Sequence, residues 1–130
     1  MTNYKLILNN LTKTFGRRII FNNLSYSFES NNIYGVAGIN GSGKSTFVKI
    51  IANILSPTKG KVIHSINNKE IEFENLFNHI GFVAPYLILY DEFSAIENLS
   101  YFCKIRGIGY SDNLAKQLLK EVNLHDRRND

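Results

Sequence analysis

The sequence predicts an α/β fold in which an antiparallel β region comes first, a parallel or mixed sheet follows, and helices occupy the last third. Three observations predict it. The first 37 residues are rich in β-forming and partly alternating apolar residues. A glycine-rich loop at 38–43 separates a short apolar run from an amphipathic segment, as in a strand–loop–helix unit. Apolar residues then recur at helical spacing between 94 and 122.

The amino-terminal part is expected to form three strands. Residues 4–11 are apolar and partly alternating, residues 19–28 are rich in β-formers, and residues 33–37 are a short apolar run. Turns between strands are predicted at three asparagine pairs: 9–10, 22–23 and 31–32.

A helix is predicted directly after the glycine-rich loop. Its apolar face comes from residues spaced i, i+3, i+4 and i+7: Phe47, Ile50, Ile51 and Ile54. Pro57 and Gly60 are expected to stop it. Residues 61–66 and 70–73 then predict a hairpin around Asn67-Asn68, and residues 80–83 predict a further short strand.

Two more helices are predicted in the last third of the chain. Ser94 and Glu97 have the spacing of a capping box, so the first of these helices should begin at Ser94 and close near Gly107. A second cap is expected at Ser111, followed by an apolar stripe that belongs to the core.

Composition narrows the classes of function. The net charge is +4, from 15 basic and 11 acidic residues, and the basic residues are scattered instead of forming a stripe. We therefore expect no nucleic-acid partner. No apolar run approaches the roughly 18 residues of a membrane span, the first residues do not resemble a signal peptide, and Cys103 is the single cysteine. These features predict a cytoplasmic protein.

The loop GINGSGKST, from Gly38 to Thr46, fits G-x-x-x-x-G-K-[ST] at every position. Its glycines let the backbone curl so that several N–H groups converge on a phosphate, and the following helix adds the positive end of its dipole. In this pattern Lys44 reaches the β- and γ-phosphates, Ser45 is a Mg²⁺ ligand, and Thr46 can donate to the α-phosphate. A chance glycine-rich turn is the alternative, but the flanking strand and helix favour nucleotide binding.

The fuller sequence resembles the ATP-binding cassette (ABC) family of transporter ATPases, which implies a P-loop NTPase core. The loop has the family's usual form, "LTKTFGRRIIFNNLSYSF" resembles its opening strands, and "KIIANILSPTKGKV" resembles its helix and next turn. The resemblance implies that Phe15 stacks on adenine; a buried strand residue is the alternative. The implied ligand-contacting residues are Phe15, Gly38, Asn40, Gly41, Ser42, Gly43, Lys44, Ser45 and Thr46, with ATP and Mg²⁺ as the ligands. A GTPase is excluded because Asn68-Lys69-Glu70-Ile71 lacks the acid of a guanine reader.

The resemblance also implies a division of the chain. Residues 1–83 should be the nucleotide-binding core part, and residues 84–130 the segment equivalent to the family's glutamine loop and the start of its helical subdomain. In the family's register Pro85 stands where a glutamine normally contacts Mg²⁺ and water. "LILYDE" looks like a Walker B strand, but the same register places Asp91 and Glu92 just before the helix capped by Ser94, exposed to solvent.

The family's signature motif and a Walker B acid pair in the expected place are missing, so the chain is expected to be truncated before them. The resemblance implies ATP hydrolysis by two such domains and a transmembrane transporter subunit that docks near 84–93, at the inner face of the membrane. We name no catalytic residue, and whether this chain alone is an enzyme stays open. We expect Mg-ATP binding without efficient turnover; the alternatives are a stand-alone regulatory module and a soluble ABC-type ATPase.

Overall fold

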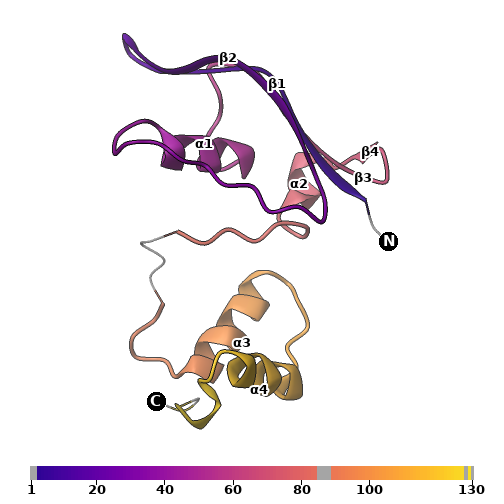
Figure 1. The fold of residues 1–130 in the computed structure, drawn as a ribbon. Helices are drawn as coiled ribbons and strands as arrows, with labels where there is room; N and C mark the ends of the chain where they lie inside the picture. Colours follow the sequence, from indigo (N-terminus) through magenta and orange to yellow (C-terminus); the bar gives the residue numbers. More distant parts are fainter. Residues whose placement is uncertain (1–2, 85–88, 128, 130) are drawn as a thin grey trace. The chain divides into compact units, whose positions relative to one another are not determined.

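The computed structural model describes residues 3–84, 89–127 and 129. The chain divides into two compact units, one up to Phe82 and one from Val83 onward, and each is described by itself. The first unit holds the sheet, α1 and α2, and the second is helical (Figure 1).

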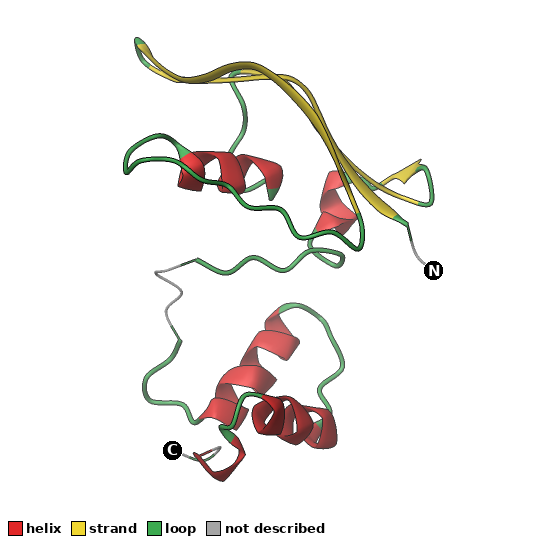
Figure 2. Ribbon diagram, viewed as in Figure 1, coloured by secondary structure: helices red, strands yellow, loops and turns green. Residues whose placement is uncertain are grey.

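Four antiparallel strands, drawn in yellow in Figure 2, form the sheet of the first unit, and their hydrogen bonds give the order β2-β1-β3-β4. The bounds are Tyr4–Phe15 for β1, Arg18–Glu29 for β2, Lys59–Ile66 for β3 and Lys69–Glu70 for β4. The expected strands at 4–11 and 19–28 are confirmed, and both are longer than predicted. The hairpin at Asn67-Asn68 is also confirmed, because both asparagines have the positive φ, 50° and 64°, of a tight hairpin turn.

None of the three asparagine pairs lies between two strands, which corrects the sequence-based expectation; the pair at 31–32 follows β2, but residues 33–37 form no strand. Asn10, with φ 48°, and Asn23, with φ 54°, lie inside β1 and β2, where the register between the strands shifts. Asparagine tolerates the left-handed conformation, and a β-bulge uses it as readily as a turn does. The chain reverses between β1 and β2 at Gly16, with φ 56°.

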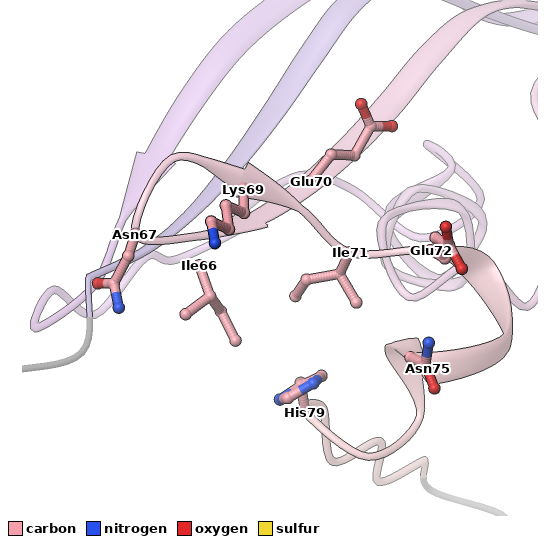
Figure 3. Close-up of a pocket in the computed structure, with 8 residues that line it drawn as sticks. All are labelled: Ile66, Asn67, Lys69, Glu70, Ile71, Glu72, Asn75 and His79. Carbon is pink, nitrogen blue, oxygen red and sulfur yellow. The ribbon is translucent and has the colours of Figure 1, made fainter.

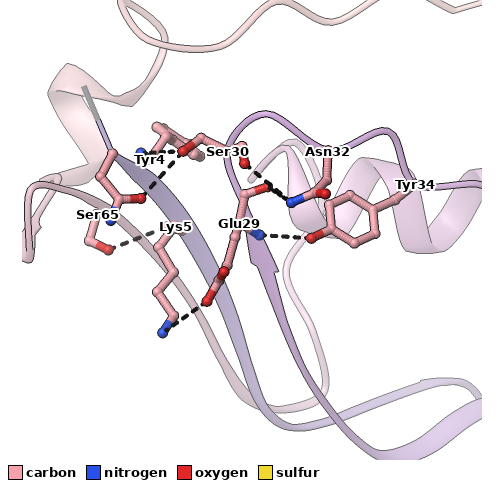
Figure 4. Close-up of polar contacts among 8 residues, drawn as sticks. Tyr4, Lys5, Glu29, Ser30, Asn32, Tyr34 and Ser65 are labelled. Atoms are coloured by element: carbon pink, nitrogen blue, oxygen red, sulfur yellow. Dashed lines mark hydrogen bonds and ion pairs between the residues drawn. The ribbon is translucent and has the colours of Figure 1, made fainter. Parts of the chain in front are cut away.

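Polar contacts join the ends of three strands (Figure 4). Ser30 N donates to Tyr4 O at 2.8 Å, and Tyr4 N donates to Ser30 Oγ at 3.3 Å. Lys5 forms an ion pair with Glu29 at 3.8 Å, and Ser65 Oγ donates to Lys5 O at 3.3 Å. These bonds fix β2 and β3 on either side of β1.

The core of the first unit lies between the sheet and α1, which spans Lys44–Ile51. Leu8 and Leu11 of β1 and Ile50 of α1 are fully buried together. The helix ends earlier than predicted, because Asn53 takes a left-handed φ of 54° and Ile54 lies outside the helix, about half exposed. Gly60 belongs to β3, where a Cβ would collide with the carbonyls of Asn9 and Asn10.

Residues 33–37 and 80–83 are irregular, so the strands predicted there are not formed. A strand is defined by hydrogen bonds to a neighbouring strand. In the described part of the chain neither segment pairs with the sheet, which contains β2, β1, β3 and β4. Ile33 is fully exposed. The second arm of the hairpin ends at Glu70, and Phe73 begins α2, Phe73–Leu76.

The second unit contains α3, Ala95–Ile105, α4, Asp112–Glu121, and a short 3₁₀ turn η1, His125–Arg127. Both predicted caps are confirmed. Ser94 and Glu97 form the complete capping box, and Ser111 Oγ accepts from Leu114 N. Gly107, with φ 63°, follows the end of α3 as expected. Among the described residues, no helix combines the length and the apolar character needed to cross a bilayer.

Candidate phosphate-binding site

The glycine-rich loop adopts a backbone conformation that its glycines require. Gly41 and Gly43 have φ values of 78° and 99°, which residues with a Cβ rarely adopt. At Gly43 a Cβ would also overlap the Ile20 Cγ2 methyl of β2. The loop therefore lies against the sheet at Gly43, and this close approach sets where α1 begins.

The first turn of α1 directs free backbone N–H groups toward the loop. Phe47 N donates to Gly43 O at 2.8 Å, so the helical bonds begin only there. No side chain caps the helix, and within the described residues the amides of Lys44, Ser45 and Thr46 have no protein acceptor. These donors and the positive end of the helix dipole favour an anion.

Lys44 folds back over the loop. Its Nζ donates to Gly38 O at 2.7 Å and to Ile39 O at 2.9 Å. These carbonyls hold the ammonium beside the free amides without neutralising its charge. An incoming phosphate oxygen can replace them as the acceptor and form a charge-assisted bond.

Phe15 and the loop share one depression of about 370 Å³. It is lined by Phe15, Arg18, Ile20, Asn40, Gly41, Gly43, Lys44, Ser45 and Thr46. The other two predicted residues, Gly38 and Ser42, line an adjoining depression. The structure thus brings all the predicted site residues together, from β1 and from the loop that precedes α1.

Phe15 is half exposed, and its ring is oriented by a neighbour that the sequence analysis did not single out. The Lys13 ammonium lies 4.8 Å from the ring centroid and donates to Ser56 O at 2.8 Å. Lys13 is 9% exposed, so this cation is held in place. Residues two apart in a strand lie on the same face, so the spacing of Lys13 and Phe15 could have predicted this contact.

The site suits the phosphates of a nucleotide with Mg²⁺ better than a metal ion alone. Ser45 lines the depression, but no Asp, Glu or His of the described residues does. Groups of three or more His, Cys, Asp or Glu that could hold a metal are also absent from the described part of the chain. A cation here would therefore take its remaining ligands from phosphate and water.

A larger cavity of about 560 Å³ lies beside the β3–β4 hairpin (Figure 3). The hairpin contributes Lys69 and Glu70, and the α2 region contributes Asn75 and His79. Its lining mixes charges of both signs and contains no residue predicted to bind a ligand. The residues predicted to bind phosphate line the smaller depression and the one adjoining it.

Comparison with known proteins decides the family. The model of the family described as ABC transporter matches residues 21–130. The chain belongs to the ABC transporter family. It corresponds to part of the family's ATP-binding component, which fits the loop geometry described above.

Individual ABC relatives agree with this assignment. An uncharacterized ABC transporter ATP-binding protein, YcbN of Bacillus subtilis, is 31% identical over 93% of this chain and 39% of its own length. The bacitracin transport ATP-binding protein BcrA of Enterococcus faecalis is 31% identical over 96% of this chain and 40% of its own. The lipoprotein-releasing ATP-binding protein LolD of Treponema denticola is also 31% identical, over 95% and 60%. This chain therefore spans about two to three fifths of these relatives.

Solved ABC structures confirm the fold. A candidate ABC transporter ATP-binding protein from Pyrococcus furiosus superimposes with a TM-score of 0.77, covering 95% of this chain and 60% of its own, at 23% identity. A bacterial Atm1-family ABC exporter with ATP bound gives 0.74, covering 94% and 21%, at 21% identity. The P-loop α/β fold class predicted from the sequence is thereby confirmed.

The described part of the Walker B look-alike in this ABC chain, residues 89–92, forms no strand. Asp91 and Glu92 are exposed and lie in a turn directly before α3, as the family register predicted. Leu87 and Ile88, the start of that stretch, lie outside the described residues, as does Pro85 with the expectation attached to it.

Asn98 holds this turn, and the sequence analysis missed it. Its Oδ1 accepts from Tyr90 N at 3.0 Å. Its amide donates to Tyr90 O at 3.0 Å, Phe93 O at 2.9 Å and Ser94 O at 3.2 Å. Asn98 is buried. Its position one residue after the capping-box glutamate does not by itself indicate this role.

Proposed function

We propose that this chain binds Mg-ATP through the glycine-rich loop, with the adenine stacked on Phe15. The strongest support for this proposal is that three unpaired amides at the start of α1 lie beside the Lys44 ammonium. Such a set of donors stabilises an anion of high charge density best, and a polyphosphate offers several acceptor oxygens at once. Ser45 would ligate Mg²⁺, which neutralises phosphate charge when bound.

Phe15 supports an adenine nucleotide over inorganic phosphate. Its half-exposed ring lies in the same depression as the phosphate donors. Base stacking on an aromatic ring contributes about 1–3 kcal/mol without demanding hydrogen-bond readout. The chain would therefore bind ATP and ADP more tightly than tripolyphosphate.

The whole protein's function is proposed to be transport driven by ATP, and this part would bind nucleotide without efficient turnover. The family membership and the transport names of BcrA and LolD support it. A membrane subunit would dock near residues 84–93, where Leu89, Tyr90 and Phe93 are exposed. The protein would then lie at the cytoplasmic face of the membrane and pair with a second ATPase domain.

Calorimetric titration with Mg-ATP tests the binding proposal. Lys44→Ala should weaken ATP binding at least about tenfold, because it removes a charge-assisted bond to phosphate. Lys49→Ala is the matched control, since Lys49 is an exposed lysine in the last turn of the same helix. Equal affinity of Lys44→Ala and wild type would contradict the proposal, as would an equal loss in the Lys49→Ala variant.

A further inference from the structure

Arg18 occupies a defined position between the proposed adenine platform and the phosphate loop. It is the first residue of β2 and is paired with Phe15 across the two-residue turn that follows β1. Its Nη2 donates to Gly41 O in the loop at 2.8 Å. One side chain therefore spans from the hairpin that carries Phe15 to the loop that precedes α1.

The charge of Arg18 is not neutralised by the protein. Among the described residues, neither Arg18 nor Lys44 takes part in an ion pair, although Lys5 on the same sheet does. Both cations line the depression, whose lining contains no acidic residue of the described chain. A guanidinium has five N–H donors, and Arg18 uses one on Gly41 O, so others are available to a ligand.

We propose that Arg18 is a second phosphate-binding cation of this site and that it binds the α-phosphate. The inference rests on the proposed nucleotide function and deepens it. With adenine on Phe15 and the terminal phosphates at Lys44, the part of the nucleotide between them is the ribose and the α-phosphate. Only the α-phosphate carries a negative charge for a guanidinium to bind.

The bond to Gly41 O gives Arg18 a positioning role as well. It fixes one peptide of the loop while the ligand is absent, so less order has to be gained when the nucleotide binds. Arg18→Gln removes the charge and, being shorter, also loses the bond to the Gly41 carbonyl. A ligand without phosphate therefore has to separate phosphate binding from support of the loop.

The test is the affinity of the purified chain for ATP, ADP and AMP, with AMP measured by competition against ADP. Arg18→Gln should weaken binding of all three by the same factor, about tenfold or more, because all three carry the α-phosphate. Arg18→Lys should lose less affinity, since it keeps the positive charge but not the paired N–H donors of the guanidinium. Arg17→Gln, a change of the neighbouring exposed arginine, should leave the affinities unchanged.

Three results would overturn the inference. They are unchanged affinities in Arg18→Gln, a loss confined to ATP, and an equal loss in Arg17→Gln. A thermal melt of each variant guards against a folding defect, and adenosine, which has no phosphate, should bind Arg18→Gln as well as wild type. If the wild-type chain does not bind ATP, the proposed function fails. If the wild-type chain binds ATP and Arg18→Gln binds it equally well, the inference about Arg18 fails but the proposed function stands.

Discussion

At the scale of single residues, His64 is a buried titratable group that serves the fold and not the phosphate site. It lies on β3, and its Nδ1 is 2.5 Å from the Tyr4 hydroxyl of β1. Burial lowers the pKa of His64 below the ordinary value of 6.5, and the Ile51 backbone opposes part of this shift. No atom of the described residues forms a hydrogen bond with its Nε2. The neutral ring is therefore the form that the fold favours.

The lowered pKa predicts that the chain loses stability in mild acid. Because the unfolded state binds the proton more tightly, the free energy of unfolding should fall as pH drops below about 6.5. Urea unfolding between neutral pH and pH ~5 measures it. His64→Leu should flatten this pH dependence, whereas His79→Gln, at an exposed histidine, should keep it. Parallel profiles for wild type and His64→Leu would contradict the assignment.

Residues differ in how readily the sequence predicts their role. The loop glycines and Lys44 form a local pattern, because a phosphate cradle is made from consecutive residues. Arg18 belongs to no such pattern, because its contact with Gly41 O depends on the path of distant backbone. Lys13 lies only two residues from Phe15, but the bond to Ser56 O that holds its ammonium over the ring also depends on distant backbone.

At the scale of elements, α3 combines a predictable start with an unpredicted attachment. The capping box of Ser94 and Glu97 is a local motif, and hydrogen bonds from Ser94 lower the pKa of the exposed Glu97 carboxyl. Asn98, one residue later, forms hydrogen bonds with the backbone of the preceding turn and so fixes the position of that turn relative to the start of α3. The turn in question contains the exposed residues of the proposed docking segment.

Asn98→Ala should loosen this turn. It leaves the Tyr90 amide and the Phe93 carbonyl without their Asn98 partner, which costs about 1–3 kcal/mol for each group that water does not reach. Hydrogen exchange checks it, because the Tyr90 amide should lose its protection. Asn113→Ala, an exposed asparagine in α4, is the control and should change neither exchange nor stability by more than about 0.5 kcal/mol. Retained protection of Tyr90 in Asn98→Ala would refute the role of Asn98.

At the scale of the whole molecule, the proposed ATP site lies entirely within the first compact unit. Its groups are donors and cations, which bind and orient phosphate. Hydrolysis also needs a group that positions or activates the attacking water. No carboxylate or imidazole of the described residues lines the depression, and Asp91 and Glu92 lie in a turn of the second unit.

We therefore predict that the chain alone binds Mg-ATP without meaningful turnover. A single-turnover experiment with radiolabelled ATP and excess protein measures it, since one cycle of phosphate release would be detected. The expected release equals that of Lys44→Ala under the same conditions. Release by wild type that disappears in Lys44→Ala would show a competent hydrolytic site and contradict the prediction.

The features that could be predicted from the sequence are those that neighbouring residues create: the glycine-rich loop and its helix, the Asn67-Asn68 hairpin, and the caps at Ser94 and Ser111. Each depends on local backbone conformation or on donors within a few residues. The α/β class followed from the order of such local patterns along the chain. Long-range contacts were needed to learn that residues 33–37 form no strand and that Asn10 and Asn23 lie at register shifts inside strands instead of ending them. The same holds for the meeting of Arg18, Phe15 and the loop. The physical reason is that strand pairing and side-chain approach depend on partners far away in the sequence, which no local pattern specifies.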